Sequence, residues 1–225
     1  SFVGFDLDGT LIDSHLAIHD CLKETLPKYV NEDIDEIIDT VFPLTIDQFP
    51  EYLNFKSKDS YLNFVKVFSQ SFDSKYYKEI NLFDHSIEVL KKSIDIFGLD
   101  NVFILTNRRE KSTYMVCKYL GISDVLGEER IFCTKKNNEN NPKVETLKKL
   151  IVELNFISKN GLYVGDSPSD IESSIENNIM PIYLSNQPKL HILDKYKLSK
   201  GKNFFRDLKE LTSFLVGLKN YNYKG

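Results

Sequence analysis

The sequence predicts an α/β fold in which a doubly wound parallel sheet carries an inserted all-helical unit. Short apolar runs, of the length of buried strands, alternate with helical patterns throughout residues 82–225. A further apolar run at residues 2–5 precedes them, and the stretch between, residues 14–81, shows only helical periodicity. These three observations divide the chain into a discontinuous α/β core, residues 1–13 and 82–225, and a helical unit, residues 14–81.

The elements of the core can be assigned in chain order. The run Phe2-Val3-Gly4-Phe5 is typical of a buried parallel strand, which is apolar on both faces. Further strands are expected at residues 102–105, 130–133, 162–164 and 181–184. Helices are expected at residues 84–97, 111–120, 143–154, 168–177 and 208–218. Such alternation forms a parallel sheet with helices on both faces, and the polar residues 137–141 and lysine-rich residues 195–202 are expected to be surface loops.

The inserted unit repeats apolar residues at helical spacing, beginning with Leu16, Leu22 and Leu26. Its aromatic residues are expected to form a core rather than a binding platform. They include Phe49, Tyr52, Phe55 and Tyr61. His15 and His19 are four residues apart, as metal ligands on a helix can be, but a zinc site would need a third ligand. This pair is therefore expected to be packed or solvated.

Composition and charge disfavour several classes of function. The chain is 41% apolar and 28% charged, which is typical of a folded globular protein. Its net charge of −4 disfavours nucleic acid as a partner, because backbone binding requires clustered lysine and arginine. No apolar run approaches the roughly 20 residues that span a bilayer, and the first residues lack a signal-peptide pattern, so we expect no membrane association. The oligomeric state is not predicted.

The cysteines favour a reducing compartment. Cys21, Cys117 and Cys133 are odd in number and widely spaced, which suggests neither a disulfide framework nor a zinc cluster. A cytoplasmic location is therefore expected.

Polar side chains follow three of the expected strands. The strand ends read Asp6-Leu7-Asp8, Thr106-Asn107-Arg108 and Gly165-Asp166-Ser167. Because ligands of open α/β sheets bind beyond the carboxyl ends of the strands, these residues are candidates for a common site. Arg108 could hold a substrate anion through two hydrogen bonds, although a solvated arginine would fit the sequence equally well.

Four carboxylates at this sheet edge predict a magnesium site. Asp6 and Asp8 are two residues apart on an extended chain, so their carboxylates lie on the same side. Asp166 and Asp170 end another strand and open the following helix. Carboxylates gathered in this way repel one another unless a cation joins them, and oxygen ligands suit Mg²⁺, so these four are the expected metal ligands. A carboxylate so placed can attack phosphorus to form an acyl phosphate, while a second one transfers the protons.

The same residues resemble the motifs of a known family. The run Phe5-Asp6-Leu7-Asp8-Gly9-Thr10-Leu11 resembles the first motif of the haloacid dehalogenase superfamily. Leu105-Thr106-Asn107 is similar to its second motif, and Gly165-Asp166-Ser167-Pro168-Ser169-Asp170 to its fourth, in the expected order. The resemblance covers essentially the whole chain and implies a Rossmann-like core with a helical cap inserted after the first motif, at residues 14–81.

This resemblance implies a role for each matching residue. Asp6 would be the nucleophile, Asp8 the general acid and base, and Asp166 a magnesium ligand, with Asp170 supporting the metal. Thr106 would hydrogen-bond the phosphoryl group, and we add Asn107 and Arg108 to the expected phosphate-binding residues. Because dehalogenases and phosphonate hydrolases of the superfamily lack aspartate at the position of Asp8, this residue favours phosphate ester chemistry.

The third motif of the family is a lysine near the start of a helix. Lys143 is our choice, since a cation at a helix N-terminus opposes the macrodipole and such broken local rules occur at working sites. The Lys-Pro-x-Pro form common in relatives is absent, which leaves Lys135 or Lys136 as alternatives. Lys143 would then act in catalysis and in phosphate binding.

The predicted function is hydrolysis of a small phosphorylated metabolite by a magnesium-dependent phosphatase through an aspartyl-phosphate on Asp6. The resemblance is to the phosphoglycolate phosphatase-like branch. A phosphomutase of the β-phosphoglucomutase type shares these motifs and remains an alternative. A non-enzymatic, phospho-accepting binding module on the same scaffold is the alternative from another class.

Overall fold

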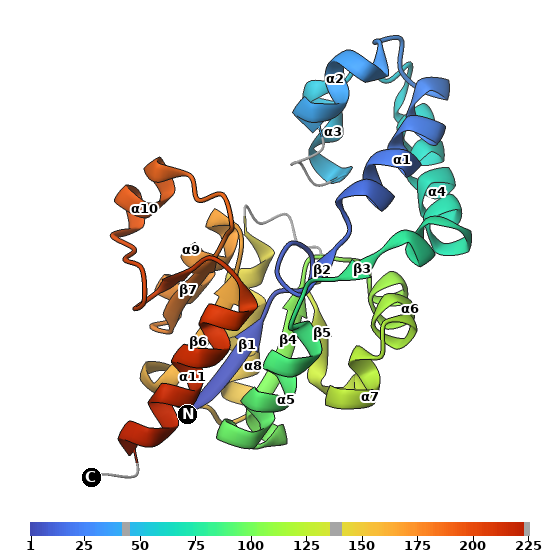
Figure 1. Ribbon diagram of the computed structural model, residues 1–225. Helices are drawn as coiled ribbons and strands as arrows, with labels where there is room; N and C mark the ends of the chain where they lie inside the picture. Colours follow the sequence, from blue (N-terminus) through green and yellow to red (C-terminus); the bar gives the residue numbers. More distant parts are fainter. Residues whose placement is uncertain (42–45, 136–140, 223–225) are drawn as a thin grey trace. The chain divides into compact units, whose positions relative to one another are not determined.

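The structure is a computed structural model that describes residues 1–41, 46–135 and 141–222 (Figure 1). The chain divides into two compact units. One comprises Ser1–Asp13 and Leu82–Gly225, and the other Ser14–Asn81. We call them the core unit and the helical unit.

The core unit contains a six-stranded parallel sheet, which confirms the predicted fold class. Its strands lie in the order β5-β4-β1-β6-β7-β8. Their bounds are Phe2–Phe5 for β1, Val102–Thr106 for β4, Ile131–Cys133 for β5, Gly161–Gly165 for β6, Met180–Leu184 for β7 and Phe204–Phe205 for β8. All residues of β1, β4 and β6 are buried, as expected for strands covered on both faces.

The strand order reverses at β1, which lies between β4 and β6. After β1 the chain first builds one half of the sheet, with β4 and β5, and then returns to the other side of β1 to build β6, β7 and β8. In doubly wound sheets the ligand crevice lies at such a switch point, outside the carboxyl ends of the strands. The residues that follow β1, β4 and β6 are therefore brought to one place.

Helices cover both faces of this sheet (Figure 1). Helices α5 and α11 pack against each other, whereas α8 and α9 pack together on the opposite face. The helices of the core unit are α5 (Ser86–Phe97), α6 (Glu110–Tyr119), α7 (Ile122–Leu126), α8 (Pro142–Glu153), α9 (Pro168–Glu176), α10 (Leu190–Tyr196) and α11 (Leu208–Asn222).

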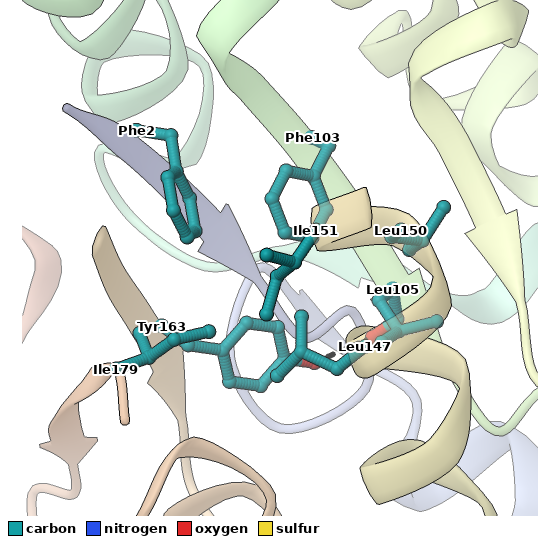
Figure 2. Close-up of a cluster of buried hydrophobic side chains, with 8 residues drawn as sticks. All are labelled: Phe2, Phe103, Leu105, Leu147, Leu150, Ile151, Tyr163 and Ile179. Carbon is teal, nitrogen blue, oxygen red and sulfur yellow. Dashed lines mark hydrogen bonds between the residues drawn. The ribbon is translucent and has the colours of Figure 1, made fainter. Parts of the chain in front are cut away.

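A cluster of buried apolar side chains holds α8 against the sheet (Figure 2). Leu147, Leu150 and Ile151 from α8 pack among aromatic rings of the sheet, and these include Phe103 and Tyr163. The Tyr163 hydroxyl donates a 2.7 Å hydrogen bond to the Leu105 carbonyl, so its one polar atom is satisfied. The cluster fixes the helix that begins beside the active-site edge of the sheet.

Among the strands of the six-stranded sheet and the helices that cover it, three short elements were not predicted from the sequence: α7, α10 and β8. Each buries only one or two side chains, for example Ile192 in α10, and so leaves too short a pattern to reveal a period. The lysine-rich residues 195–202 comprise the end of α10 and the connection that follows it. Their lysines are exposed, but Leu198 is buried in a second apolar cluster, so the connection is tied to the core. Of the expected loop 137–141, only Asn141 lies within the described residues.

The helical unit contains α1 (His15–Thr25), α2 (Ile34–Val41), α3 (Phe49–Tyr52) and α4 (Lys58–Ser74). In α4, Phe64, Phe68 and Phe72 recur every four residues and are buried. The Phe49 and Phe55 rings pack on Phe64, as expected for core aromatics, whereas Tyr52 is exposed. Strands β2 (Ile12–Asp13) and β3 (Asn81–Leu82) form a separate two-stranded sheet. None of the described helices has the length and apolar character needed to cross a membrane.

Candidate active site

Asp6 lies directly after the central strand β1. Its backbone N–H donates a 2.8 Å hydrogen bond to the Val164 carbonyl of β6, which extends the pairing of the two strands to this residue. Leu7 is fully buried, and the Asp6 side chain is only 9% exposed. The carboxylate is thus held at the switch point of the sheet with little access to water.

Lys143 provides the cation that Asp6 faces. Its side chain is 2% exposed, and its Nζ lies 2.7 Å from Asp6 Oδ1 and 2.6 Å from Asp170 Oδ1. The lysine projects from the first turn of α8, the helix held by the apolar cluster. Of the alternatives, Lys135 is exposed and Lys136 lies outside the described residues.

Asp170 belongs to the first turn of α9 and is fixed by a reciprocal cap. The Ser167 hydroxyl accepts a hydrogen bond from the Asp170 N–H, and the Asp170 carboxylate accepts one from the Ser167 N–H, the arrangement of a capping box. Asp170 Oδ2 also accepts a 2.5 Å hydrogen bond from the Ser167 hydroxyl. Gly165 has no space for a side chain, since a Cβ there would collide with the Asp170 side chain. Both oxygens of Asp170 are therefore already bonded to the protein.

Three carboxylates meet beside Lys143. Oxygens of Asp6, Asp166 and Asp170 all lie within 4.8 Å of one another, and no other such group of possible metal ligands occurs among the described residues. An oxygen-only donor set is the kind that Mg²⁺ prefers. When ionised, the three carboxylates would carry three negative charges against the single positive charge of Lys143, so a divalent cation would fit both the chemistry and the charge of the cluster.

The pKa values of these groups reflect the crowding. Burial, and next the Asp170 carboxylate, raise the pKa of Asp6 well above its ordinary value, against the opposing effect of Lys143. Burial and Asp170 likewise raise the pKa of Asp166 to about 7. Burial alone would lower the pKa of Lys143, but Asp170 and Asp6 outweigh it and raise that pKa well above 10.5. Without a bound cation the raised pKa values let Asp6 and Asp166 hold protons more readily than free carboxyls, while the lysine stays charged.

Thr106 ends β4 at the same edge and is buried. Its Oγ1 accepts a 3.1 Å hydrogen bond from the Arg108 N–H, which leaves the hydroxyl proton for another acceptor. Asn107 is exposed, and its Oδ1 accepts a 3.1 Å hydrogen bond from the Thr134 hydroxyl. The turn after β4 is thus ordered by side-chain hydrogen bonds.

Arg108 holds Asp8. Its Nε lies 3.0 Å from Asp8 Oδ2 and its Nη2 lies 2.5 Å from Asp8 Oδ1, a two-pronged pair. The remaining Nη1 donates to the Ser112 hydroxyl at 3.0 Å, and the Arg108 side chain is 8% exposed. The Asp8 carboxylate therefore pairs with Arg108 and is not part of the three-carboxylate cluster.

A tight turn separates Asp6 from β2. The N–H groups of Leu11 and Ile12 both donate to the Leu7 carbonyl, and the Gly9 N–H donates to the Ile12 carbonyl. Gly9 has a φ of 78°, and a Cβ there would collide with the Asp166 carboxylate. Glycine is required at this position both for its backbone conformation and for the close approach of Asp166.

One residue of the site was missed by sequence reasoning. Asn141 is the N-cap of α8, and its side chain accepts from the Lys143 N–H at 3.2 Å. The order Asn-Pro before a helix is a start signal, with the cap followed by proline in the first turn, and it could have been found in the sequence.

Elsewhere, His15 and His19 stack their rings in the helical unit, with centroids 6.3 Å apart.

Comparison with known proteins agrees with this architecture. The sequence profile of the haloacid dehalogenase-like hydrolase family matches residues 3–183, a span that includes all the carboxylates and the lysine described above. One relative, named "Putative pyrophosphatase PpaX", comes from Caldanaerobacter subterraneus subsp. tengcongensis. It is 24% identical over 225 residues, which cover 95% of this chain and 93% of the relative.

Solved structures share the fold over nearly the full length. A HAD hydrolase of family IA, variant 3, from Entamoeba histolytica superposes with a TM-score of 0.75 at 18% identity, covering 98% of this chain and 99% of the other. A HAD family hydrolase from Deinococcus radiodurans, solved with bound phosphate and sodium, gives 0.66 at 16% identity, covering 96% and 95%. From the profile match, over most of its length, the chain belongs to the haloacid dehalogenase-like hydrolase family.

Proposed function

We infer that this hydrolase is a magnesium-dependent phosphatase that cleaves a small phosphorylated metabolite through an aspartyl-phosphate on Asp6. The observation that carries the inference is the buried Asp6 carboxylate, which faces Lys143 and lies beside two further carboxylates at the switch point of the sheet. Such a site suits the transfer of a doubly charged phosphoryl group to a carboxylate.

The first step forms a bond between an Asp6 oxygen and phosphorus and breaks the bond from phosphorus to the leaving oxygen. Lys143 balances charge on the phosphoryl oxygens, and the free hydroxyl proton of Thr106 can be donated to one of them. Magnesium, held by Asp6 and Asp166 beside Asp170, would supply the remaining positive charge. These groups are held by strand ends and helix starts, so little reorganisation accompanies the reaction.

Asp8 is the group that we assign to proton transfer. In the first step it gives a proton to the leaving oxygen, and in the second it takes one from the water that hydrolyses the aspartyl-phosphate. Its carboxylate is separate from the three-carboxylate cluster and is oriented by the two hydrogen bonds from Arg108. That orientation supports a role in which position matters more than metal binding.

A phosphorylated substrate is supported by two of the relatives. The hydrolase from Deinococcus radiodurans contains phosphate, and the relative from Caldanaerobacter carries the name of a pyrophosphatase. We further propose that the helical unit acts as a cap that selects the substrate. Exchange of residues 14–81 for those of a relative with another substrate should change substrate preference while the Asp6 chemistry is retained.

The test measures hydrolysis of an aryl phosphate by the purified protein with Mg²⁺, with EDTA, and in the variant Asp6→Asn. Activity should require Mg²⁺ and should fall by about 10³-fold or more in Asp6→Asn, because the nucleophile is gone. Mass spectrometry of the acid-quenched enzyme should find a phosphoryl group on Asp6. As the matched control, Asp124→Asn removes an exposed carboxylate of α7 and should leave the rate unchanged.

Other outcomes distinguish the alternatives. Conversion of a sugar phosphate to its isomer, with the phosphoenzyme re-used, would identify a phosphomutase. Labelling of Asp6 by a small acyl phosphate, without turnover of any member of a broad metabolite panel, would favour a phospho-accepting binding module. Activity that persists in Asp6→Asn would contradict the proposed mechanism altogether.

A further inference from the structure

Lys143 is held in an unfavourable place, the first turn of α8. A buried ammonium in the first turn of a helix opposes the helix dipole, and the backbone N–H groups at that end repel it. Its Nζ nevertheless lies within 2.7 Å of two carboxylates that come from different elements. Something must fix the start of α8 relative to β1 and α9.

The side-chain amide of Asn141 bridges the starts of α8 and α9. Its Oδ1 accepts from the Lys143 N–H at 3.2 Å and from the Ser169 hydroxyl at 3.0 Å. Its Nδ2 donates a 3.0 Å hydrogen bond to the Ser169 carbonyl. Asn141 and Ser169 are therefore joined by two hydrogen bonds of opposite direction.

The chemistry of this bridge requires an amide. The Ser169 carbonyl can only accept a hydrogen bond, so it needs a donor. The Lys143 N–H and the Ser169 O–H both donate, so they need an acceptor. One side chain must therefore present both a donor and an acceptor. The Ser173 hydroxyl oxygen lies 3.4 Å from Asn141 Oδ1, but it is nearer the Ser169 carbonyl, to which it donates at 2.6 Å. An ionised aspartate at position 141 could cap the helix but has no proton for that carbonyl, and the single hydroxyl oxygen of a serine cannot replace both Oδ1 and Nδ2.

The hydrogen bonds between Asn141 and Ser169 lie next to both residues of the Lys143–Asp170 ion pair. Asn141 is two residues before Lys143, and Ser169 is the residue before Asp170. On the other side of Lys143, the Val144 carbonyl accepts a 3.0 Å hydrogen bond from Asn177 Nδ2 at the end of α9. The lysine is thus flanked on both sides by residues that are hydrogen-bonded to α9.

We propose that Asn141 is a positioning residue, which sets the register of α8 against α9 so that the Lys143 ammonium lies between Asp6 and Asp170. The proposal deepens the phosphatase function inferred above and depends on it only for its kinetic readout. Asn141 itself contacts none of the three carboxylates in the described contacts and acts through Lys143.

Two substitutions separate the bridge from the cap. Asn141→Ser keeps a side-chain oxygen at the N-cap but lacks the second polar atom, Nδ2, that bonds the Ser169 carbonyl, whereas Asn141→Ala loses both. Asp207→Ala is the matched control, since Asp207 Oδ1 accepts from the Glu210 N–H at 2.8 Å at the start of α11, on the other face of the sheet. All three variants are expected to fold, with the two alanine variants lowered in melting temperature by similar amounts.

The first readout is the crystal structure of wild type and of Asn141→Ser without metal. The distance from Lys143 Nζ to Asp6 Oδ1 should lengthen by about 1 Å or more in the variant. The second readout is aryl phosphate kinetics, in which kcat should fall about 10-fold to 100-fold in both Asn141 variants while KM changes by less than about threefold, because misplacement of a charge in the transition state acts on kcat. Asp207→Ala should retain kcat within about twofold of wild type.

Retention of both Lys143 ion pairs in Asn141→Ser would overturn the proposal, whatever the kinetics show. A kcat loss in Asp207→Ala equal to that in Asn141→Ala would overturn it too, because general destabilisation would then explain the effect. If wild type hydrolyses no phosphate ester at all, the phosphatase function fails, and the ion-pair distances still decide the role of Asn141.

Discussion

Arg108 donates two hydrogen bonds, at 3.0 Å and 2.5 Å, to the carboxylate of Asp8, which lies a hundred residues earlier in the sequence. From the sequence this arginine was a candidate for binding a substrate anion, with a solvated side chain equally possible. The structure pairs its guanidinium with the residue that we assign to proton transfer. A third contact, with the Ser112 hydroxyl, holds the arginine itself. The pair links the end of β4 to the turn that follows β1.

Substitution Arg108→Lys should therefore lower kcat rather than raise KM. Lysine keeps the charge but lacks the planar fork, so the Asp8 carboxylate loses its fixed orientation. We expect kcat to fall about 10-fold to 100-fold with a small change in KM, measured with an aryl phosphate. Arg130→Lys alters another arginine–aspartate pair, with Asp100, and should have no such effect. A large increase in KM at constant kcat would show that Arg108 binds the substrate.

The stability of the metal-free protein should depend on pH through Asp166. Burial, followed by Asp170, raises the pKa of this carboxyl from 3.8 to about 7, so the folded protein binds the proton more tightly than the unfolded chain. Its contribution to stability is full below about pH 4 and is lost as the pH rises to about 7. We expect the melting temperature in EDTA to fall over this range, and the slope to be smaller in Asp166→Asn than in Asp124→Asn.

Magnesium should stabilise the protein more at pH 8 than at pH 5. At the higher pH the Asp166 carboxyl, whose pKa is raised to about 7, is mostly charged and attracts the cation, whereas at the lower pH a proton occupies it and competes with the cation. Differential scanning fluorimetry with and without Mg²⁺ at the two pH values measures this difference. An equal shift at both would contradict a metal site formed by Asp6 and Asp166.

Gly9→Ala should destabilise the protein more than Gly201→Ala. Both glycines have positive φ, at 78° and 77°, so each substitution has a similar backbone cost of about 1–2 kcal/mol. A Cβ at Gly201 meets nothing within 4 Å, whereas one at Gly9 collides with the Asp166 carboxylate. Urea unfolding should therefore give the larger loss of free energy for Gly9→Ala, and activity should be lost in that variant alone.

Leu147→Ala should test the anchoring of α8. Leu147 is fully buried in the cluster that holds the helix on the sheet, so its truncation should cost about 2–5 kcal/mol of unfolding free energy. Val152 on the same helix is 76% exposed, and Val152→Ala should change stability by about 0.5 kcal/mol or less. Similar losses in the two variants would mean that the cluster does not anchor α8.

The sequence predicted the fold because strands and helices alternate with strong periods. It also predicted that polar strand ends would gather, since parallel strands place their carboxyl ends at one edge, and the meeting of Asp6 with Asp166 follows from that topology. The pairing of Asp8 with Arg108 could not be predicted, because strand position does not determine where a long side chain ends. The N-cap role of Asn141 could have been found from the Asn-Pro order, but its bridge to Ser169 could not, since that amide acts on a neighbouring helix whose register only the packing determines.

The central place of β1 has a consequence for folding. This strand is the first in the chain, yet Val3 pairs with Val102 on one side and with Leu162 on the other. During synthesis one of its edges stays without a partner until β4 has been made, and the other until β6 has been made. Such non-local pairing slows folding and leaves strand edges open to aggregation. The helical unit is made between β1 and its partner strands. Because residues 14–81 form a compact unit, they can fold before the sheet is complete.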